Sequence, residues 1–135
     1  MAEDLIRLDI VTPAGLLMSE NVAALNLPAA LGSMGVLKNH APLMTTLKIG
    51  TVKYTKNNVD HYLAVHGGFA EVKDNVVIIL ADSAEKAEDI DVARAEAAKQ
   101  RAEERLKKRD AELDVLRAEM ALHRALTRIK TSYKA

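Results

Sequence analysis

The distribution of glycine and proline divides this chain of 135 residues into two parts. All six glycines and all three prolines lie at or before Gly68, and the chain after residue 84 is rich in Ala, Glu and Arg at helical spacing. Both residue types interrupt helices and favour turns, so short strands are expected early and long helices late. The sequence therefore predicts a β-domain over residues 1–84 and a helical unit over residues 85–135, joined by an acidic hinge.

Alternating apolar and polar residues predict the strands of the first part. The spacing predicts a strand over Leu5–Val11, a turn at Thr12–Gly15, and one or two strands over Leu16–Leu27 that end at Pro28. The glycines of residues 32–35 bracket a bend. Short strands separated by turn signals about every eight to twelve residues are typical of a small antiparallel sandwich or barrel.

A hairpin and a fully apolar strand complete the predicted β-domain. Ile49–Tyr54 and Val59–Val65 flank Lys56–Asn58, and asparagine tolerates the positive φ of a tight turn. Gly67–Gly68 then interrupts the apolar run. Val76–Leu80 is apolar at every position, which predicts a strand buried on both faces.

Helical spacing begins near Asp89, which can cap a first helix with Asp91 in its first turn. Residues 107–110 predict a break, and Asp110 can cap a second helix that ends near Lys130. The two helices are expected to form an antiparallel hairpin. The apolar stripe of the first helix consists mainly of alanines, and each buried methyl-sized group contributes only about 0.8 kcal/mol. We therefore expect the hairpin to be held weakly.

The second helix carries apolar residues on two sides, although a helix in a simple hairpin needs one apolar face. One stripe contains Leu113, Leu116 and Met120, and the other contains Val115, Ala118, Leu122, Leu126 and Ile129. One interpretation is that the second stripe rests on the β-domain. The alternative is that it contacts a different partner in a second, extended conformation.

Several classes of function are disfavoured by composition and spacing. The chain has no Cys and a formal net charge of zero, which disfavours thiol chemistry and nucleic-acid binding. No apolar run reaches the ~20 residues of a membrane span, so a protein that is at most peripheral to a membrane is expected. The four histidines lack metal-ligand spacing, and no catalytic motif is found, so we expect neither a metal site nor an enzyme.

Six arginines recur at equal spacing on the two predicted helices. Arg94, Arg101 and Arg105 share one face of the first helix, and Arg117, Arg124 and Arg128 repeat that spacing on the second. Packed antiparallel, the helices could place guanidinium groups around a phosphate. The alternative is an exposed face whose charge is balanced by Glu103, Glu104 and Glu119.

Motifs along the whole chain resemble one known family. Gly35–Leu37 with His40–Leu43, Gly67–Val72, Ile78–Asp82 and Ala87–Asp91 are similar to the epsilon subunits of bacterial-type F-type ATP synthases. The resemblance implies a ten-stranded β-sandwich followed by a helical hairpin. It also implies a non-catalytic rotor subunit of the central stalk, peripheral to the cytoplasmic face of a bacterial plasma membrane.

The resemblance further implies the partners. The sandwich would bind the gamma subunit and the c-ring, and the helices, when extended, would reach the alpha/beta catalytic head and inhibit ATP hydrolysis. Subunit contacts are implied for His40, Ala41, Pro42 and Leu43. Ser33 stands in the ring-facing loop where many members carry an acid, and Lys38-Asn39 replaces the more usual Pro-Gly.

Some members of the family bind ATP through a motif of Ile or Leu, Asp, two variable residues, Arg and Ala. Ile90, Asp91 and Arg94 match it, followed by Ala95. Other positions that the family associates with the nucleotide correspond to Glu85, Arg101, Arg124 and Arg128. The resemblance therefore implies ATP as a regulatory ligand that stabilises the folded hairpin. The alternative is a static scaffold that links gamma to the c-ring.

Overall fold

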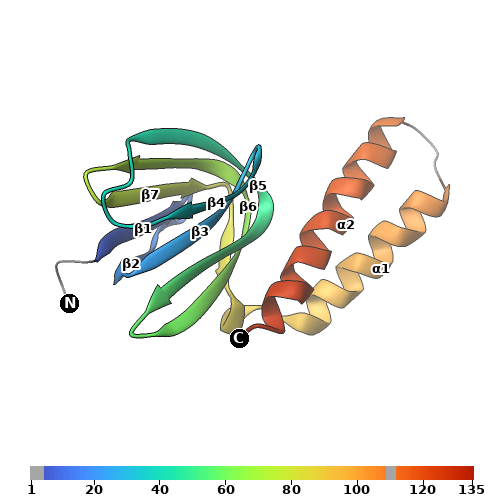
Figure 1. Ribbon diagram of the computed structural model, residues 1–135. Helices are drawn as coiled ribbons and strands as arrows, with labels where there is room; N and C mark the ends of the chain where they lie inside the picture. The colour runs from blue at the N-terminus through green and yellow to red at the C-terminus, as the bar shows by residue number, and fades with distance from the viewer. Residues whose placement is uncertain (1–4, 109–111) are drawn as a thin grey trace.

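The computed structural model describes residues 5–108 and 112–135 and shows a β-domain followed by two helices (Figure 1). The strands are β1 (Ile6–Thr12), β2 (Gly15–Val22), β3 (Ala24–Ala29), β4 (Gly32–Val36), β5 (Leu43–Lys56), β6 (Val59–Lys73), β7 (Val76–Ala81) and β8 (Ala84–Lys86). A 3-10 helix, η2 (Ala87–Asp89), precedes α1 (Val92–Lys108) and α2 (Glu112–Ser132). The predicted order of a β-sandwich and a helical hairpin is confirmed.

The strands follow the order β2-β1-β7-β6-β5-β3-β4, with β8 pairing with β6. All pairs are antiparallel except β1 with β7, which is parallel. The eight strands of the described residues are fewer than the ten that the resemblance implies. The strands β5 and β6 are the longest of them, with 14 and 15 residues.

The core of the β-domain is aliphatic apart from Tyr54. The strands curve around it (Figure 1). Ile6, Leu8 and Ile10 alternate with exposed or half-buried residues, as predicted. The prediction that Val76–Leu80 is buried on both faces is wrong. Val77 and Ile79 are buried, whereas Leu80 is 53% exposed, so this strand has one face in the core and one face toward solvent.

The turns follow the local sequence closely. The predicted hairpin turn is confirmed, with φ of 53° at Asn57 and 64° at Asn58. Two other expectations are wrong: β3 continues through Pro28, and the glycine-flanked residues 32–35 form most of β4 rather than a bend. Gly67–Gly68 does not end β6 either, because the antiparallel ladder with β5 continues on both sides of the pair.

The first helix begins one residue after Asp91. The backbone N–H of Arg94 donates to Asp91 Oδ1 at 3.0 Å, so Asp91 is the N-cap. Asp89, expected to serve as the cap, ends the preceding 3-10 helix instead. Asp110 lies outside the described residues, and α1 continues to Lys108 through the first part of the predicted break.

The helices pack through alanines and leave one apolar side of α2 uncovered. The buried residues of the helix pair include Ala95, Ala102, Ala118 and Ala125. Leu116 and Met120 are 57% and 44% exposed. The described members of this stripe therefore lie in solvent, while the other side of α2 supplies most of its packing. Leu126 of that second stripe is also 43% exposed.

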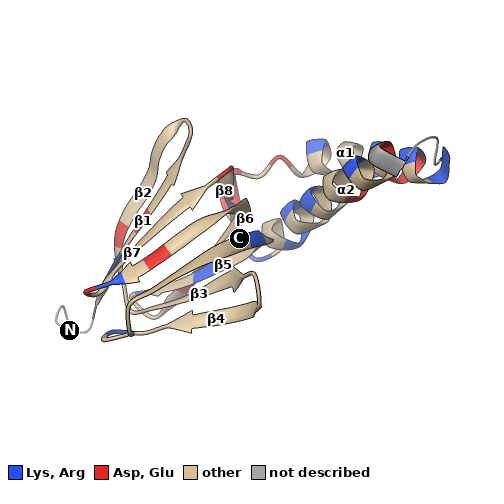
Figure 2. Ribbon diagram, turned by 90° about the horizontal axis from the view of Figure 1, so that it is seen from above, with Lys and Arg blue, Asp and Glu red and all other residues tan. Residues whose placement is uncertain are grey.

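Within the described residues, α2 makes the main contact of the hairpin with the sandwich (Figure 1). Thr131 is fully buried against β5, where its hydroxyl hydrogen-bonds the Thr51 hydroxyl at 2.8 Å. The end of the hairpin near the helix–helix connection projects away from the sandwich (Figure 2). The hairpin is therefore anchored at one end, by the last turns of α2.

Candidate functional site

A cavity of about 500 Å³, which we call the junction cavity, lies where β8 meets both helices. Its lining is formed by Ser83, Glu85, Asp89, Asp91, Arg94, Ala95, Ala98, Arg101 and Arg128. Five of the seven residues expected to bind a nucleotide therefore surround one cavity. Two do not line it: Ile90 is buried at 8% exposure, and Arg124 is half-buried on α2.

Glu85 and Arg128 join the sandwich to the helical hairpin across this cavity. Arg128 Nε donates to Glu85 Oε1 at 2.5 Å, with the side chains 30% and 34% exposed. The two residues lie 43 positions apart in the chain, so the ion pair connects β8 directly to α2. The family resemblance associates both residues with a nucleotide but gives no sign that they contact each other.

Two guanidinium groups that line the junction cavity form no ion pair with another described residue. Arg94 and Arg101 are exposed on the first helix, and neither forms a salt bridge within the described residues. Asp91 is occupied as the cap of the same helix. The junction cavity is thus lined by the Glu85–Arg128 pair, the carboxylates of Asp89 and Asp91, and two guanidinium forks of α1 that could bind phosphate oxygens.

The other arginines are separated from this group. Arg105 and Arg117 line a different cavity of about 420 Å³, together with Lys108, Asp114 and Ala118. The equal spacing of the six arginines therefore does not place them around one ligand. Since the helices are antiparallel, residues late in α1 meet residues early in α2, and the two ends of the hairpin each receive part of the set.

His66 is a residue near the site whose role sequence reasoning missed. It lies on β6 as expected, but it is only 6% exposed, and neither ring nitrogen has a hydrogen-bond partner within the described residues. The pKa of His66 is lowered to about 4. Burial is the largest cause, and the nearby Arg128 adds to the shift, whereas Glu85 opposes it to a smaller extent. The imidazole is therefore neutral at physiological pH.

The residues expected to contact other subunits lie apart from the junction cavity, on the sandwich. Ser33 is exposed on β4, and its hydroxyl donates to Asn26 Oδ1 at 2.6 Å. His40 is half-buried, with Nδ1 2.7 Å from the Ala41 carbonyl oxygen. Ala41, Pro42 and Leu43 are exposed.

The loop that carries these residues is held in place by the β6–β7 turn. The backbone N–H of Asn39 donates to Asn75 Oδ1 at 2.6 Å, and both residues have positive φ. The loop therefore has a fixed shape, with the apolar side chains of Pro42 and Leu43 available at the surface.

An exposed apolar row on the outer face of the sheet also escaped the sequence reasoning. Leu16, Val11, Leu80 and Phe69 are successive partners across β2, β1, β7 and β6. Leu16, Leu80 and Phe69 are each more than half exposed, and so is nearby Met44 on β5. Exposed apolar patches of this kind commonly mark protein interfaces. The apolar run of β7 was the available signal, but it was interpreted as a strand with no free face.

Metal ligation and membrane crossing both require features that the described part of the chain lacks. It contains no group of three or more His, Asp or Glu residues placed to hold a metal ion. Among the described helices, none combines the length and the apolar character that crossing a bilayer requires.

The chain matches two family models that together span most of its length. Residues 5–87 match the ATP synthase Delta/Epsilon chain beta-sandwich domain, and residues 88–132 match the ATP synthase Delta/Epsilon chain long alpha-helix domain. The chain is 51% identical over 126 residues to an ATP synthase epsilon chain of Desulforamulus reducens, covering 93% of this chain and 96% of that one. It is 46% identical over 135 residues to an ATP synthase epsilon chain of Syntrophomonas wolfei, covering 99% and 98%.

Two solved structures are also similar. A chain of the Euglena gracilis mitochondrial ATP synthase, in a structure of OSCP, F1 and c-ring in rotational state 1, has a TM-score of 0.81 at 26% identity. The match covers 92% of this chain and 79% of that chain. A chain of the Tetrahymena thermophila mitochondrial ATP synthase central stalk and c-ring has a TM-score of 0.67 at 15% identity, covering 93% and 95%, and this likeness concerns the fold alone.

Proposed function

Because this chain belongs to the ATP synthase delta/epsilon chain family, we propose that it is a non-catalytic central-stalk subunit whose helical hairpin regulates ATP hydrolysis. The sandwich would bind the gamma subunit and the c-ring and so take part in coupling rotation to ion transport. The hairpin would detach from the sandwich and extend along gamma into the alpha/beta head. The complex, rather than this subunit, would supply the attachment to the cytoplasmic face of a bacterial membrane.

The exposed surface of the sandwich supports the two stalk contacts. The apolar row on the outer face, which includes Phe69 and Leu80, offers a surface for gamma. At the turn between β3 and β4, Leu31 is fully exposed close to Ser33. An apolar side chain at a hairpin tip could pack against the c-ring where Ser33 supplies no negative charge.

The way the hairpin is docked supports its mobility. Its contact with the sandwich includes the Thr51–Thr131 hydrogen bond and the Glu85–Arg128 ion pair. A hydrogen bond contributes about 1 kcal/mol net, and a partly exposed ion pair contributes up to about 1 kcal/mol. Both helices exceed the ~12–15 residues below which isolated helices are marginal, so they could remain helical after detaching.

ATP is the proposed ligand of the junction cavity, and one observation carries this proposal. Arg94 and Arg101 of α1 face the same cavity as Glu85 of β8 and Arg128 of α2. A triphosphate held by these arginines would bridge α1 and α2 next to β8. Since such a ligand binds only the docked arrangement, it would stabilise docking by about 1.4 kcal/mol at ten times its Kd.

The static scaffold is the second candidate, and the Glu85–Arg128 pair favours it. This ion pair closes the junction between sandwich and hairpin without any ligand. A scaffold would keep the hairpin docked throughout the catalytic cycle. Removal of residues 89–135 from the assembled synthase separates the two candidates, because ATP hydrolysis would rise for a regulatory arm and stay unchanged for a scaffold.

Titration of the isolated protein with ATP tests the nucleotide part. We expect the thermal unfolding midpoint to rise with ATP concentration, and we expect Arg94→Ala to abolish most of the rise. Arg105→Ala is the matched control, because Arg105 lines the other cavity. An unchanged midpoint at millimolar ATP, or equal loss in both variants, would remove ATP from the proposal and leave the stalk function standing.

A further inference from the structure

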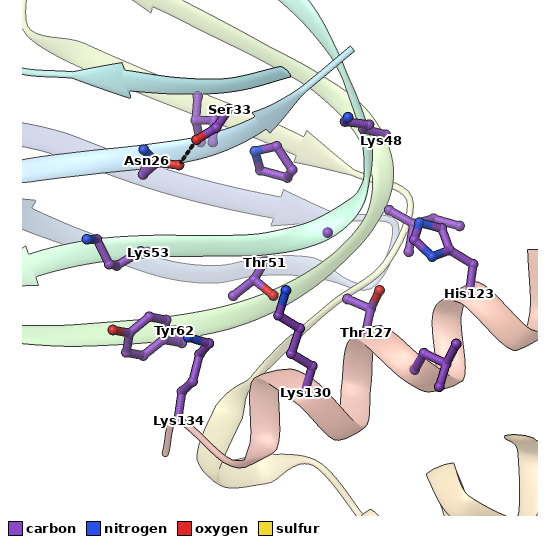
Figure 3. Close-up of a pocket in the computed structure, with 15 residues that line it drawn as sticks. Asn26, Ser33, Lys48, Thr51, Lys53, Tyr62, His123, Thr127, Lys130 and Lys134 are labelled. Atoms are coloured by element: carbon purple, nitrogen blue, oxygen red, sulfur yellow. Dashed lines mark hydrogen bonds between the residues drawn. The ribbon is translucent and has the colours of Figure 1, made fainter. Parts of the chain in front are cut away.

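A second cavity, of about 610 Å³, lies between α2 and the sheet on a different side of α2 from the junction cavity (Figure 3). We call it the lysine groove. Its basic side chains are Lys48 and Lys53 of β5, His123 and Lys130 of α2, and Lys134, which follows the end of α2. Within the described residues, no Asp or Glu contributes to its lining. The groove is therefore a strongly positive region in a chain whose net charge is zero.

The positive side chains come from both walls of the groove. His123 and Lys130 are seven residues apart, so they share one side of α2, and Lys134 lines the same cavity from the turn after the helix. None of the four lysines forms a salt bridge with another described residue. Like charges that share a cavity repel one another, and this arrangement is unfavourable unless an anion occupies the space between them.

Polar groups lie among these cations. Figure 3 shows Lys130 extending from α2 toward β5, and the Thr127 hydroxyl turned toward the same space. Thr127 is only 7% exposed. Lys134 Nζ lies 5.0 Å from the centre of the Tyr62 ring, which holds the end of that flexible side chain at the groove. Hydroxyl and ammonium donors in one cavity are the groups that bind phosphate oxygens.

The groove is a consequence of how the strands are built. Asn26 pairs with Lys53 and Ala29 pairs with Leu47, so residues 48–52 of β5 bulge away from β3 between these two points. Gly50 lies beneath Pro28, where an added Cβ would be 2.6 Å from Pro28 Cβ. The irregular segment of β5 lines the cavity from the sheet, and α2 closes the opposite side.

We propose that the lysine groove binds a small anion with two or more phosphate groups, which bridges β5 and α2. A compact polyphosphate carries charge on all sides and can meet both walls at once. An extended acidic peptide would turn alternate side chains away from the lysines. The volume is within the range of about 300–1,000 Å³ typical of small-molecule sites. The proposal is independent of ATP binding in the junction cavity.

Occupation of the groove would affect the position of the hairpin. The anion would contact β5 and α2 only while α2 rests on the sheet, so its binding would favour the docked arrangement. Because the lysine ammonium groups are accessible to solvent, the affinity would fall as ionic strength rises.

Pyrophosphate is the probe for a test on the full-length chain. Titration followed by amide NMR is expected to shift the resonances of Thr51, Thr127 and Lys130, and the unfolding midpoint is expected to rise. The double variant Lys130→Gln/Lys134→Gln should weaken pyrophosphate binding at least tenfold. Lys99→Gln/Lys107→Gln removes the same charge from α1 and should leave binding unchanged. Lys53→Gln, on the sheet side, provides a second weakened variant if the helix variant folds poorly.

Further titrations distinguish binding in the lysine groove from binding in the junction cavity and from general attraction of anions. Arg94→Ala should retain the pyrophosphate shifts, because Arg94 lines only the junction cavity. ATP that shifts the same three resonances would identify a nucleotide as the source of the phosphates, whereas pyrophosphate binding without such ATP shifts would identify free polyphosphate. Three results would overturn the proposal. They are equal shifts with sulfate at matched ionic strength, tighter binding of tetraglutamate than of pyrophosphate, and unchanged pyrophosphate binding in both Lys130→Gln/Lys134→Gln and Lys53→Gln.

Discussion

At the scale of single residues, His66 determines how the docked hairpin responds to acid. Its imidazole is buried beneath α2, near Arg124, Arg128 and His123, with Glu85 as the nearby opposing charge. Protonation of His66 would add a positive charge among these basic groups. Neither ring nitrogen has a hydrogen-bond partner among the described residues that could stabilise that charge. The pKa of His66 in the folded chain, about 4, lies below the ordinary value of 6.5. The contribution of the neutral imidazole to the free energy of unfolding is therefore fully present above pH 6.5 and is lost as the pH falls toward 4.

We therefore expect the free energy of unfolding to fall by about 1 kcal/mol between pH 7.5 and pH 5.5 through this group alone. His66→Gln should remove that part of the pH dependence, measured by urea unfolding at the two pH values. His40→Gln, in the β4–β5 loop, is the control and should keep the wild-type slope. Equal slopes in all three proteins would show that His66 is protonated as readily in the folded chain as in the unfolded one.

At the scale of elements, the Gly67–Gly68 pair lies where the pairing of β6 passes from β7 to β8. Residues 68–73 of β6 pair with β7, and residues 63–65 pair with β8. Gly68 has a φ of 128°, and a Cβ there would lie 2.1 Å from the Leu80 carbonyl oxygen. The register of pairing is the same on both sides of the pair, so β8 continues along the edge of β6 on which β7 ends, and this places Glu85 within reach of Arg128.

Gly68→Ala is expected to lower the free energy of unfolding by at least about 2 kcal/mol, because both the backbone angle and the contact are unfavourable. Gly35→Ala is the matched control within the same domain. Its Cβ would meet no atom within 4 Å, and the residue has no positive φ. Denaturant unfolding should leave the Gly35 variant within about 1 kcal/mol of wild type, and a similar loss in both variants would contradict the role assigned to Gly68.

The elements also differ in how well the sequence predicted them. Period-two alternation identified β1, and the Asn57–Asn58 turn identified the β5–β6 hairpin, because both signals are local. The exposed face of β7 could not be predicted, since an all-apolar strand looks the same whether its second face is covered by its own chain or left free. For the site, motif positions identified most of the lining of the junction cavity. The Glu85–Arg128 contact depends on how α2 docks, which no local pattern encodes.

At the scale of the whole molecule, the surfaces are divided between the two parts of the chain. The outer face of β1, β2, β6 and β7 carries the apolar row beside charged residues such as Asp9 and Glu71, whereas the hairpin carries charge along much of its length (Figure 2). Three large apolar side chains of this face are more than half exposed: Leu16, Phe69 and Leu80. Exposed apolar side chains of this kind favour association with a partner that covers them.

We expect Phe69→Glu to leave the isolated chain about as stable as wild type, because surface substitutions usually change stability by less than about 0.5 kcal/mol. The same variant should fail to assemble with gamma, as measured by co-purification of the stalk subunits. Val59→Glu, which alters an exposed residue at the β5–β6 turn, is the control and should assemble normally. Normal assembly of the Phe69 variant would place the gamma contact elsewhere on the sandwich.

The parallel pairing of β1 with β7 has a consequence for biosynthesis. Residues 7–11 find their partners at residues 76–80, so the first strand made by the ribosome must wait for one of the last strands before the sheet can close. The helices come later still and are stabilised mainly by contacts near in sequence, which form quickly. During translation, the strands of the outer face therefore emerge before the whole hairpin does. A partner of that face could bind the nascent chain before the hairpin has docked on the sheet.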